Sequence, residues 1–146
     1  MTTVLLALLI YMNIKSINLL YAIVPHTLVF VLPVLYIHYN YYTVNKGVQF
    51  ILDNSGIYKN TNGNEVFYNA SEFDQIEFVM TGKRISNMTL GNLPFEDYYY
   101  AKIHLNQFSD VIIITCLYPD KVENLLKAAY EKIPIKYSKQ FFPKIL

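Results

Sequence analysis

The sequence lacks tryptophan, contains one cysteine, and has almost no charge in its first third. A single cysteine, Cys116, excludes an intramolecular disulfide. It lies in the apolar run 111–117, which is typical of a buried strand, and a free cysteine in such a place acts as a small hydrophobic residue. We therefore interpret Cys116 as a core residue and not as a catalytic one.

Motifs for catalysis and ligand binding are also missing. There is no phosphate-binding loop, nucleophile elbow, His-Glu-x-x-His helix or cysteine pair. The three histidines are dispersed, so we expect neither a metal nor a cofactor. After residue 45 the eleven basic and eleven acidic residues balance, which argues against a nucleic-acid partner. These absences favour a protein that is not an enzyme and has no small-molecule substrate.

What the first third contains instead is apolar sequence, in which Lys15 is the only formal charge before residue 46. Residues 17–39 are long enough to cross a bilayer, because 23 helical residues rise ~34 Å and the hydrocarbon core is ~30 Å thick. Tyrosines at 39, 41 and 42 then resemble an interfacial aromatic belt. We predict a transmembrane helix over 17–39 within a membrane region, 1–45.

A shorter apolar run, residues 2–12, precedes this span. As a helix it would rise only ~16 Å, too little to cross alone. It is interpreted as the first arm of a transmembrane helical hairpin, with an interfacial helix or a truncated span as alternatives.

Three residues inside the span are candidate intramembrane functional residues: Pro25, His26 and Pro33. Prolines in membrane helices usually bend the helix, and they sometimes form functional kinks. An ionisable residue within a span is a functional hypothesis by default. For His26 the alternatives are a proton relay and a structural hydrogen bond to a carbonyl that Pro25 frees, and we favour the second.

Residues 46–146 have the pattern of a small α+β domain. Alternating apolar and polar residues predict six or seven short antiparallel strands over 47–117. Asn62-Gly63 is typical of a type I′ hairpin turn, and 111–117 is expected to be a central strand. An apolar stripe predicts one amphipathic helix over 120–133, which Pro134 ends, followed by a tail, 134–146.

This order of elements, with the segments 52–58 (LDNSGIY), 69–76 (NASEFDQI) and 118–126 (YPDKVENLL), resembles bacterial pleckstrin-homology-like (PH-like) domains. The resemblance is to those that follow a pair of membrane helices. It implies a PH-like β-sandwich or barrel closed by a C-terminal helix, and it implies no catalytic activity.

Two surface sites are candidates for function. Lys83 and Arg84 are candidate lipid contacts, because PH domains of eukaryotes hold phosphoinositides with basic residues on an early hairpin loop. An ordinary charged turn is the alternative, since lipid recognition usually takes ~4–8 basic residues. Tyr98, Tyr99 and Tyr100 are candidates for a protein interface, with burial in the core as the equal alternative.

The sequence thus predicts a membrane-anchored accessory or regulatory subunit that docks a membrane protein or a second copy of itself. The bilayer is its second expected partner. With Lys15 and Lys46 flanking the span, charge leaves the orientation nearly open. The missing disulfides favour a domain in the cytoplasm, and the resemblance implies a bacterial inner membrane. Alternatives are an anionic-lipid sensor or a small component of a solute or proton transport complex.

Overall fold

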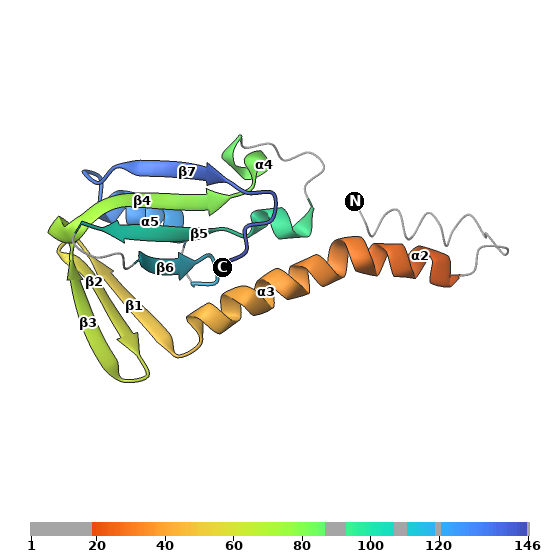
Figure 1. Ribbon diagram of the computed structural model, residues 1–146, viewed down its shortest axis with the longest axis horizontal. Coiled ribbons are helices and arrows are strands. Elements are labelled where there is room, and N and C mark those ends of the chain that lie inside the picture. Colours follow the sequence, from red (N-terminus) through yellow and green to blue (C-terminus); the bar gives the residue numbers. More distant parts are fainter. Residues whose placement is uncertain (1–18, 87–92, 107–110, 119–120, 146) are drawn as a thin grey trace. The chain divides into compact units, whose positions relative to one another are not determined.

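The computed structural model describes residues 19–86, 93–106, 111–118 and 121–145. The chain separates into two compact units, Met1–Pro33 and Val34–Leu146. The boundary predicted after residue 45 therefore falls inside the second unit, because the last turns of the apolar helix pack against the sheets (Figure 1).

The apolar helix is continuous through α2 (Leu19–His26), a π-helical turn (Thr27–Val31) and α3 (Leu32–Asn45). Its stretch Ile23–Asn45 is long and apolar enough to cross a membrane, a criterion that signal sequences and core helices of soluble proteins also meet. It is the one such helix among the described residues, so no hairpin is observed there. The expected first arm, 2–12, lies outside them.

The last three turns of α3 belong to the domain core. Ile37 and Tyr41 are completely buried, whereas Tyr39 and Tyr42 are exposed. The helix therefore continues beyond the predicted end of the span at residue 39, to Asn45, and one tyrosine of the predicted belt, Tyr41, is a core residue.

The first sheet has three antiparallel strands in the order β1 (Val48–Asp53), β2 (Gly56–Thr61) and β3 (Asn64–Asn69). The predicted Asn-Gly turn joins β2 to β3, with φ of 52° at Asn62 and 91° at Gly63. Both values are positive, as a type I′ turn requires.

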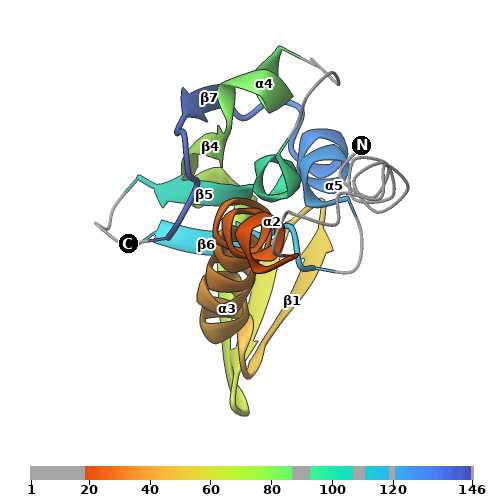
Figure 2. The same ribbon diagram turned by 90° about the vertical axis from the view of Figure 1, so that its right-hand side faces the viewer.

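The second sheet has four strands in the order β6-β5-β4-β7, which Figure 2 shows in an end view. Its members are β4 (Phe73–Met80), β5 (Tyr100–Leu105), β6 (Val111–Thr115) and β7 (Ile135–Lys139), and β7 runs parallel to β4. The prediction that residues 111–117 form a central strand is wrong, because β6 lies at an edge. Its residues are apolar on both faces because each face of the sheet packs on a core cluster.

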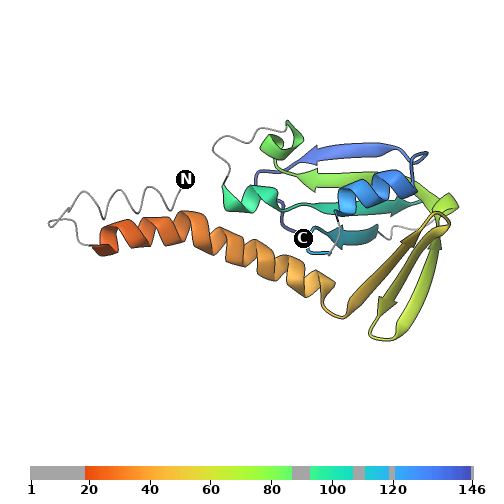
Figure 3. The same cartoon turned by 180° about the vertical axis from the view of Figure 1, so that it is seen from behind.

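The C-terminal region differs from the prediction in two ways. Helix α5 covers Val122–Ala129 and ends before Pro134. The expected tail then contributes β7, and Ile76 N donates a hydrogen bond to Pro134 O. Helix α5 lies over one face of the four-stranded sheet (Figure 3).

Two hydrophobic clusters fill the domain, one on each face of the second sheet. The larger joins both sheets to α5 and includes Phe50, Ile57, Ile76, Phe78, Tyr99, Ala101, Ile103, Ile112, Ile114, Val122 and Leu126. The smaller joins α3 to the opposite face and consists of Ile37, Tyr41, Val79, Phe95, Tyr100 and Ile145. Strands β4 and β5 divide their alternate residues between these clusters, as their pattern predicted.

Candidate functional site

The basic pair Lys83–Arg84 lies in a helical turn, α4 (Gly82–Ile85), and not in a hairpin loop. The Thr81 hydroxyl caps this turn by accepting a hydrogen bond from Arg84 N. Lys83 Nζ is 3.3 Å from Oε2 of Glu96, a carboxylate that is itself buried. The Lys83 ammonium group therefore pairs with a carboxylate of the domain itself.

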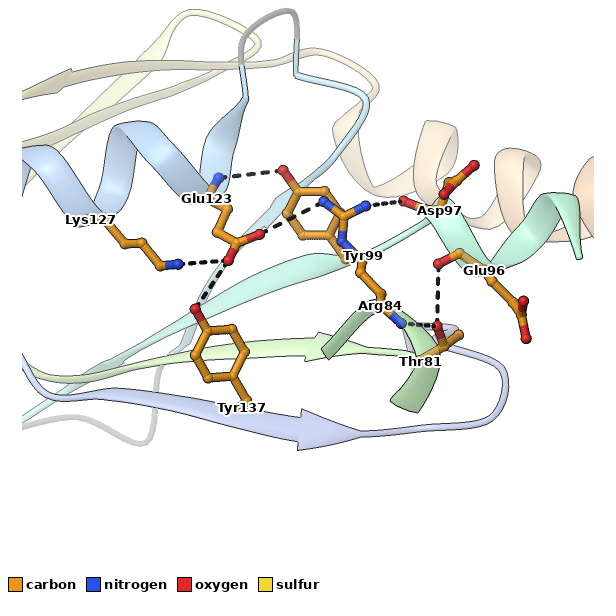
Figure 4. Close-up of polar contacts among 8 residues, drawn as sticks. All are labelled: Thr81, Arg84, Glu96, Asp97, Tyr99, Glu123, Lys127 and Tyr137. Atoms are coloured by element: carbon orange, nitrogen blue, oxygen red, sulfur yellow. Dashed lines mark hydrogen bonds and ion pairs between the residues drawn. The ribbon is translucent and has the colours of Figure 1, made fainter. Parts of the chain in front are cut away.

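Arg84 is engaged as well (Figure 4). Its guanidinium carbon lies 4.1 Å from the centre of the Tyr99 ring. One terminal nitrogen is 3.4 Å from Asp97 O and the other is 3.7 Å from a carboxylate oxygen of Glu123. Arg84 thus joins α4 to α5 and to residues 97–99, which precede β5, and it contributes to the structure of the domain.

Glu123 is the centre of this polar network (Figure 4). Its carboxylate accepts hydrogen bonds from Lys127 Nζ at 2.8 Å and from the Tyr137 hydroxyl at 3.1 Å. Burial opposes ionisation, but these bonds and the nearby cations outweigh it and hold the pKa of Glu123 below its ordinary value. The hydrogen bond to Glu123 in turn raises the pKa of Lys127. The network links α5 to β7, a strand that the sequence analysis did not predict.

A pocket of about 490 Å³ lies beside the network. Arg84, Tyr99, Cys116, Tyr118 and Glu123 line part of it. Burial raises the pKa of the Cys116 thiol, which disfavours the reactive thiolate. No group of three His, Cys, Asp or Glu side chains suited to a metal occurs among the described residues.

The three consecutive tyrosines are divided between the two core clusters. Tyr99 is 5% exposed and Tyr100 is 2% exposed, so the core alternative applies to both and the interface prediction is corrected. Tyr98 is partly buried, and its hydroxyl lies 3.0 Å from His38 Nδ1. These tyrosines therefore build the domain and attach α3 to it.

The three intramembrane candidates, Pro25, His26 and Pro33, lie in the apolar helix around its π-helical turn. Neither proline breaks the helix, and the π-turn Thr27–Val31 lies between them. The imidazole of His26 stacks on the Phe30 ring at 5.0 Å between centres. This stack is the contact that the structure describes for His26, and the hydrogen bond to a carbonyl freed by Pro25 stays a prediction.

The structure adds a surface that sequence reasoning missed, on the outer face of the first sheet. Ile51, Tyr58 and Phe67 are paired in register across the three strands, and they are 66%, 42% and 41% exposed. The Tyr58 and Phe67 rings are 4.4 Å apart. We call these three residues the aromatic row. The Asn-Gly turn fixes the register in which β2 and β3 pair. That register places Tyr58 opposite Phe67, so the turn was the sequence signal from which this row could have been predicted.

The aromatic row ends at an open edge of the sheet. Among the described strands β3 pairs with β2 alone, so its second edge carries unpaired backbone groups. Edge strands are commonly protected by lysine, proline or a bulge. Strand β3 contains one charge, Glu65, and no proline. An apolar row beside an unprotected edge is suited to adding a strand from another protein.

A family model described as a PH domain matches residues 1–123. The chain belongs to this family, which confirms the resemblance at that level. The matched segment includes the apolar helix and both sheets up to β6, and it ends before β7. No curated protein and no solved structure matches the chain.

Proposed function

We propose that this protein is a non-enzymatic, membrane-anchored accessory subunit whose PH domain docks a protein partner. The observation that carries the proposal is the aromatic row beside the open edge of β3. The setting that we propose is a bacterial inner membrane, with the domain in the cytoplasm.

The partner suited to this surface is a protein that offers an extended segment with apolar side chains. Its backbone would pair with the free edge of β3, and one of its side chains would extend the row beyond Phe67. Strands in a sheet lie ~4.8 Å apart, so the added strand lies within contact of the Phe67 ring. In this arrangement the backbone hydrogen bonds between the two strands provide affinity, and the side chains of the added strand provide specificity.

The apolar helix supports the anchoring part of the proposal. Because residues 34–45 belong to the domain, the membrane segment lies before them. Fifteen helical residues, 19–33, rise ~22 Å, which is less than a hydrocarbon core of ~30 Å. A full crossing therefore also requires residues before 19, and the span is shifted toward the N-terminus of the predicted one.

The two alternatives have less support. An anionic-lipid sensor built on Lys83 and Arg84 would have to compete with the Glu96 and Glu123 carboxylates that pair with them. A transport component built on His26 would need a partner group within reach, and its described contact is the Phe30 ring.

The test is site-specific photocrosslinking in native membranes. A photoreactive phenylalanine replaces Phe67 in one variant and Leu125 in the other. Leu125 is also apolar and exposed, but it lies on α5. We expect one defined adduct from position 67 and none from position 125, and the same partner should co-purify stoichiometrically with the unmodified chain in mild detergent.

The control is the double variant Tyr58→Ser, Phe67→Ser, with Leu125→Ser as its match. All three side chains are exposed, so we expect both variants to fold. The double variant should lose at least ten-fold in partner recovery, while Leu125→Ser should retain it. A chain that purifies as a clean monomer, or equal recovery by both variants, would contradict the proposal.

A further inference from the structure

The C-terminal end of the chain is locally basic although the domain is neutral. After Glu131 the sequence contains four lysines and no acidic residue. Lys139 immediately precedes residues 140–145, which we call the C-terminal strap, and Lys144 lies within it; both lysines are exposed. The charge balance over the whole domain hides this asymmetry, and the strap lies outside the segment that matches the family.

The strap is fixed along α3 by hydrogen bonds. The Tyr41 hydroxyl donates to Pro143 O at 2.6 Å. Ile145 bonds twice to the Asn40 side chain: its N donates to Oδ1 at 2.8 Å, and its O accepts from Nδ2 at 3.1 Å. The Phe142 ring stacks on Tyr36, one turn nearer the apolar stretch. A rigid segment thus runs beside the helix.

This rigid strap holds one phenylalanine in solvent. Phe141 is 78% exposed, the highest value among the large apolar side chains of the described residues. Its ring contacts Phe95, which also contacts Phe142. The Lys139 side chain lies over Gly82, where an added Cβ would come within 2.4 Å of Lys139 Cε. Phe141 therefore lies between exposed lysines at the α4 end of the domain.

The geometry points to a second membrane contact: Phe141, flanked by Lys139 and Lys144, inserts into the headgroup layer of an anionic bilayer. The inference rests on the proposed anchoring. A protruding aromatic ring with lysines around it is suited to this layer, where the ring leaves water and the ammonium groups attract lipid phosphates.

The proposed contact follows closely in sequence on the proposed membrane segment. The Tyr36–Phe142 stack lies three residues after Pro33, where the first compact unit ends. Three helical residues rise only ~4.5 Å. Residues 19–33 contain no Asp, Glu, Lys or Arg. With that stretch in a bilayer, the strap begins at the level of the headgroups and would fix the domain against the membrane surface.

The absence of tryptophan allows a direct test with the full-length chain. Phe141→Trp and Phe67→Trp each introduce a single tryptophan, the first two residues after β7 and the second in β3. The end of β7 and strand β3 lie at opposite ends of the domain (Figure 1). Each variant is reconstituted into vesicles of phosphatidylcholine and phosphatidylglycerol that contain brominated phosphatidylcholine. Flotation measures anchoring, bromine quenching measures membrane contact, and aqueous acrylamide measures exposure.

We expect tryptophan at 141 to emit at shorter wavelength and to be quenched by the brominated lipid at least three-fold more than tryptophan at 67. Adding Lys139→Glu and Lys144→Glu should halve that quenching in anionic vesicles. If the chain floats and both tryptophans respond equally to acrylamide and not to bromine, the headgroup contact is wrong and the anchoring stands. If the chain does not float, the anchoring itself is wrong.

Discussion

The two halves of the apolar helix both lack Asp, Glu, Lys and Arg, but their surroundings differ. From Tyr21 to Pro33, none of the side chains that the structure describes is buried. From Val34 to Asn45, Ile37 and Tyr41 are completely buried. By hydropathy the two halves form one potential membrane span. The second half nevertheless packs in the core of the domain.

A few polar side chains that bond to the rest of the domain distinguish the buried half of the helix from the exposed half. Asn40 bonds to Ile145, Tyr41 bonds to Pro143, and Asn45 Nδ2 donates to Thr115 Oγ1 at 2.5 Å. These groups satisfy backbone and side-chain partners that the docked helix would otherwise bury without hydrogen bonds. Polar side chains spaced along one face are typical of a helix that packs on a domain and not of one that faces lipid. The following predictions test whether the two halves differ in this way.

The largest effect is expected from Tyr41→Ala. Truncating a fully buried aromatic side chain leaves a cavity and costs ~3–5 kcal/mol of unfolding free energy. Tyr39→Ala, at a side chain that is 67% exposed, should change it by less than ~0.5 kcal/mol. Urea unfolding of the full chain in detergent measures both. Equal effects would show that the docked half is not part of the core.

A smaller effect is expected from Asn40→Ala, which removes both hydrogen bonds to Ile145. Each bond contributes ~0.5–1.5 kcal/mol net, so we expect a loss of ~1–3 kcal/mol. Loosening of the strap should also accelerate amide hydrogen exchange in residues 141–145. Thr43→Ala is the matched control, because the hydrogen bond that the structure describes for its hydroxyl goes to Asn40 O within the same helix. Unchanged exchange in Asn40→Ala would contradict the fixed strap.

Local patterns predicted much of the fold. Alternation in 76–80 and 99–105 gave the correct inward faces, and the Asn62-Gly63 turn has the predicted geometry. The apolar stripe gave α5, although the helix is shorter than predicted. These features depend on neighbours in sequence, which is why one chain suffices to find them.

Features that depend on distant contacts were missed. Strand β7 has the alternating sequence 135–139, but its parallel pairing with β4 depends on where α5 lies. Core and interface were equal alternatives for Tyr99 and Tyr100, because their burial depends on distant elements: Tyr99 packs in the cluster that includes α5, and Tyr100 in the cluster that includes α3. Lys83 and Arg84 looked available for lipid because their acidic partners, Glu96 and Glu123, are 13 and 39 positions further along the chain.

Acid provides a way to weaken the domain without changing the apolar half, which has no carboxylate. The folded-state pKa of Glu123 is depressed, so its contribution to stability is full above the ordinary glutamate pKa of ~4.3 and is lost as pH falls through the lower folded value. Glu123→Gln should cost on the order of 1 kcal/mol at pH 7. The difference from the unmodified chain should shrink as pH falls below ~4.3, and a difference that does not change with pH in this acidic range would rule out this ionic origin.

The smallest effect is expected from His26→Ala, in the half of the helix without buried side chains. The substitution removes an aromatic stack with Phe30, which lies in the same helix and the same compact unit. Since the stack that the structure describes for His26 lies within the first unit, the unfolding free energy of the domain should change by less than ~0.5 kcal/mol. Phe95→Ala, in the buried cluster beneath the strap, is the contrasting variant and should cost ~3–5 kcal/mol. A destabilisation by His26→Ala as large as that of Phe95→Ala would mean that the two halves fold as one unit.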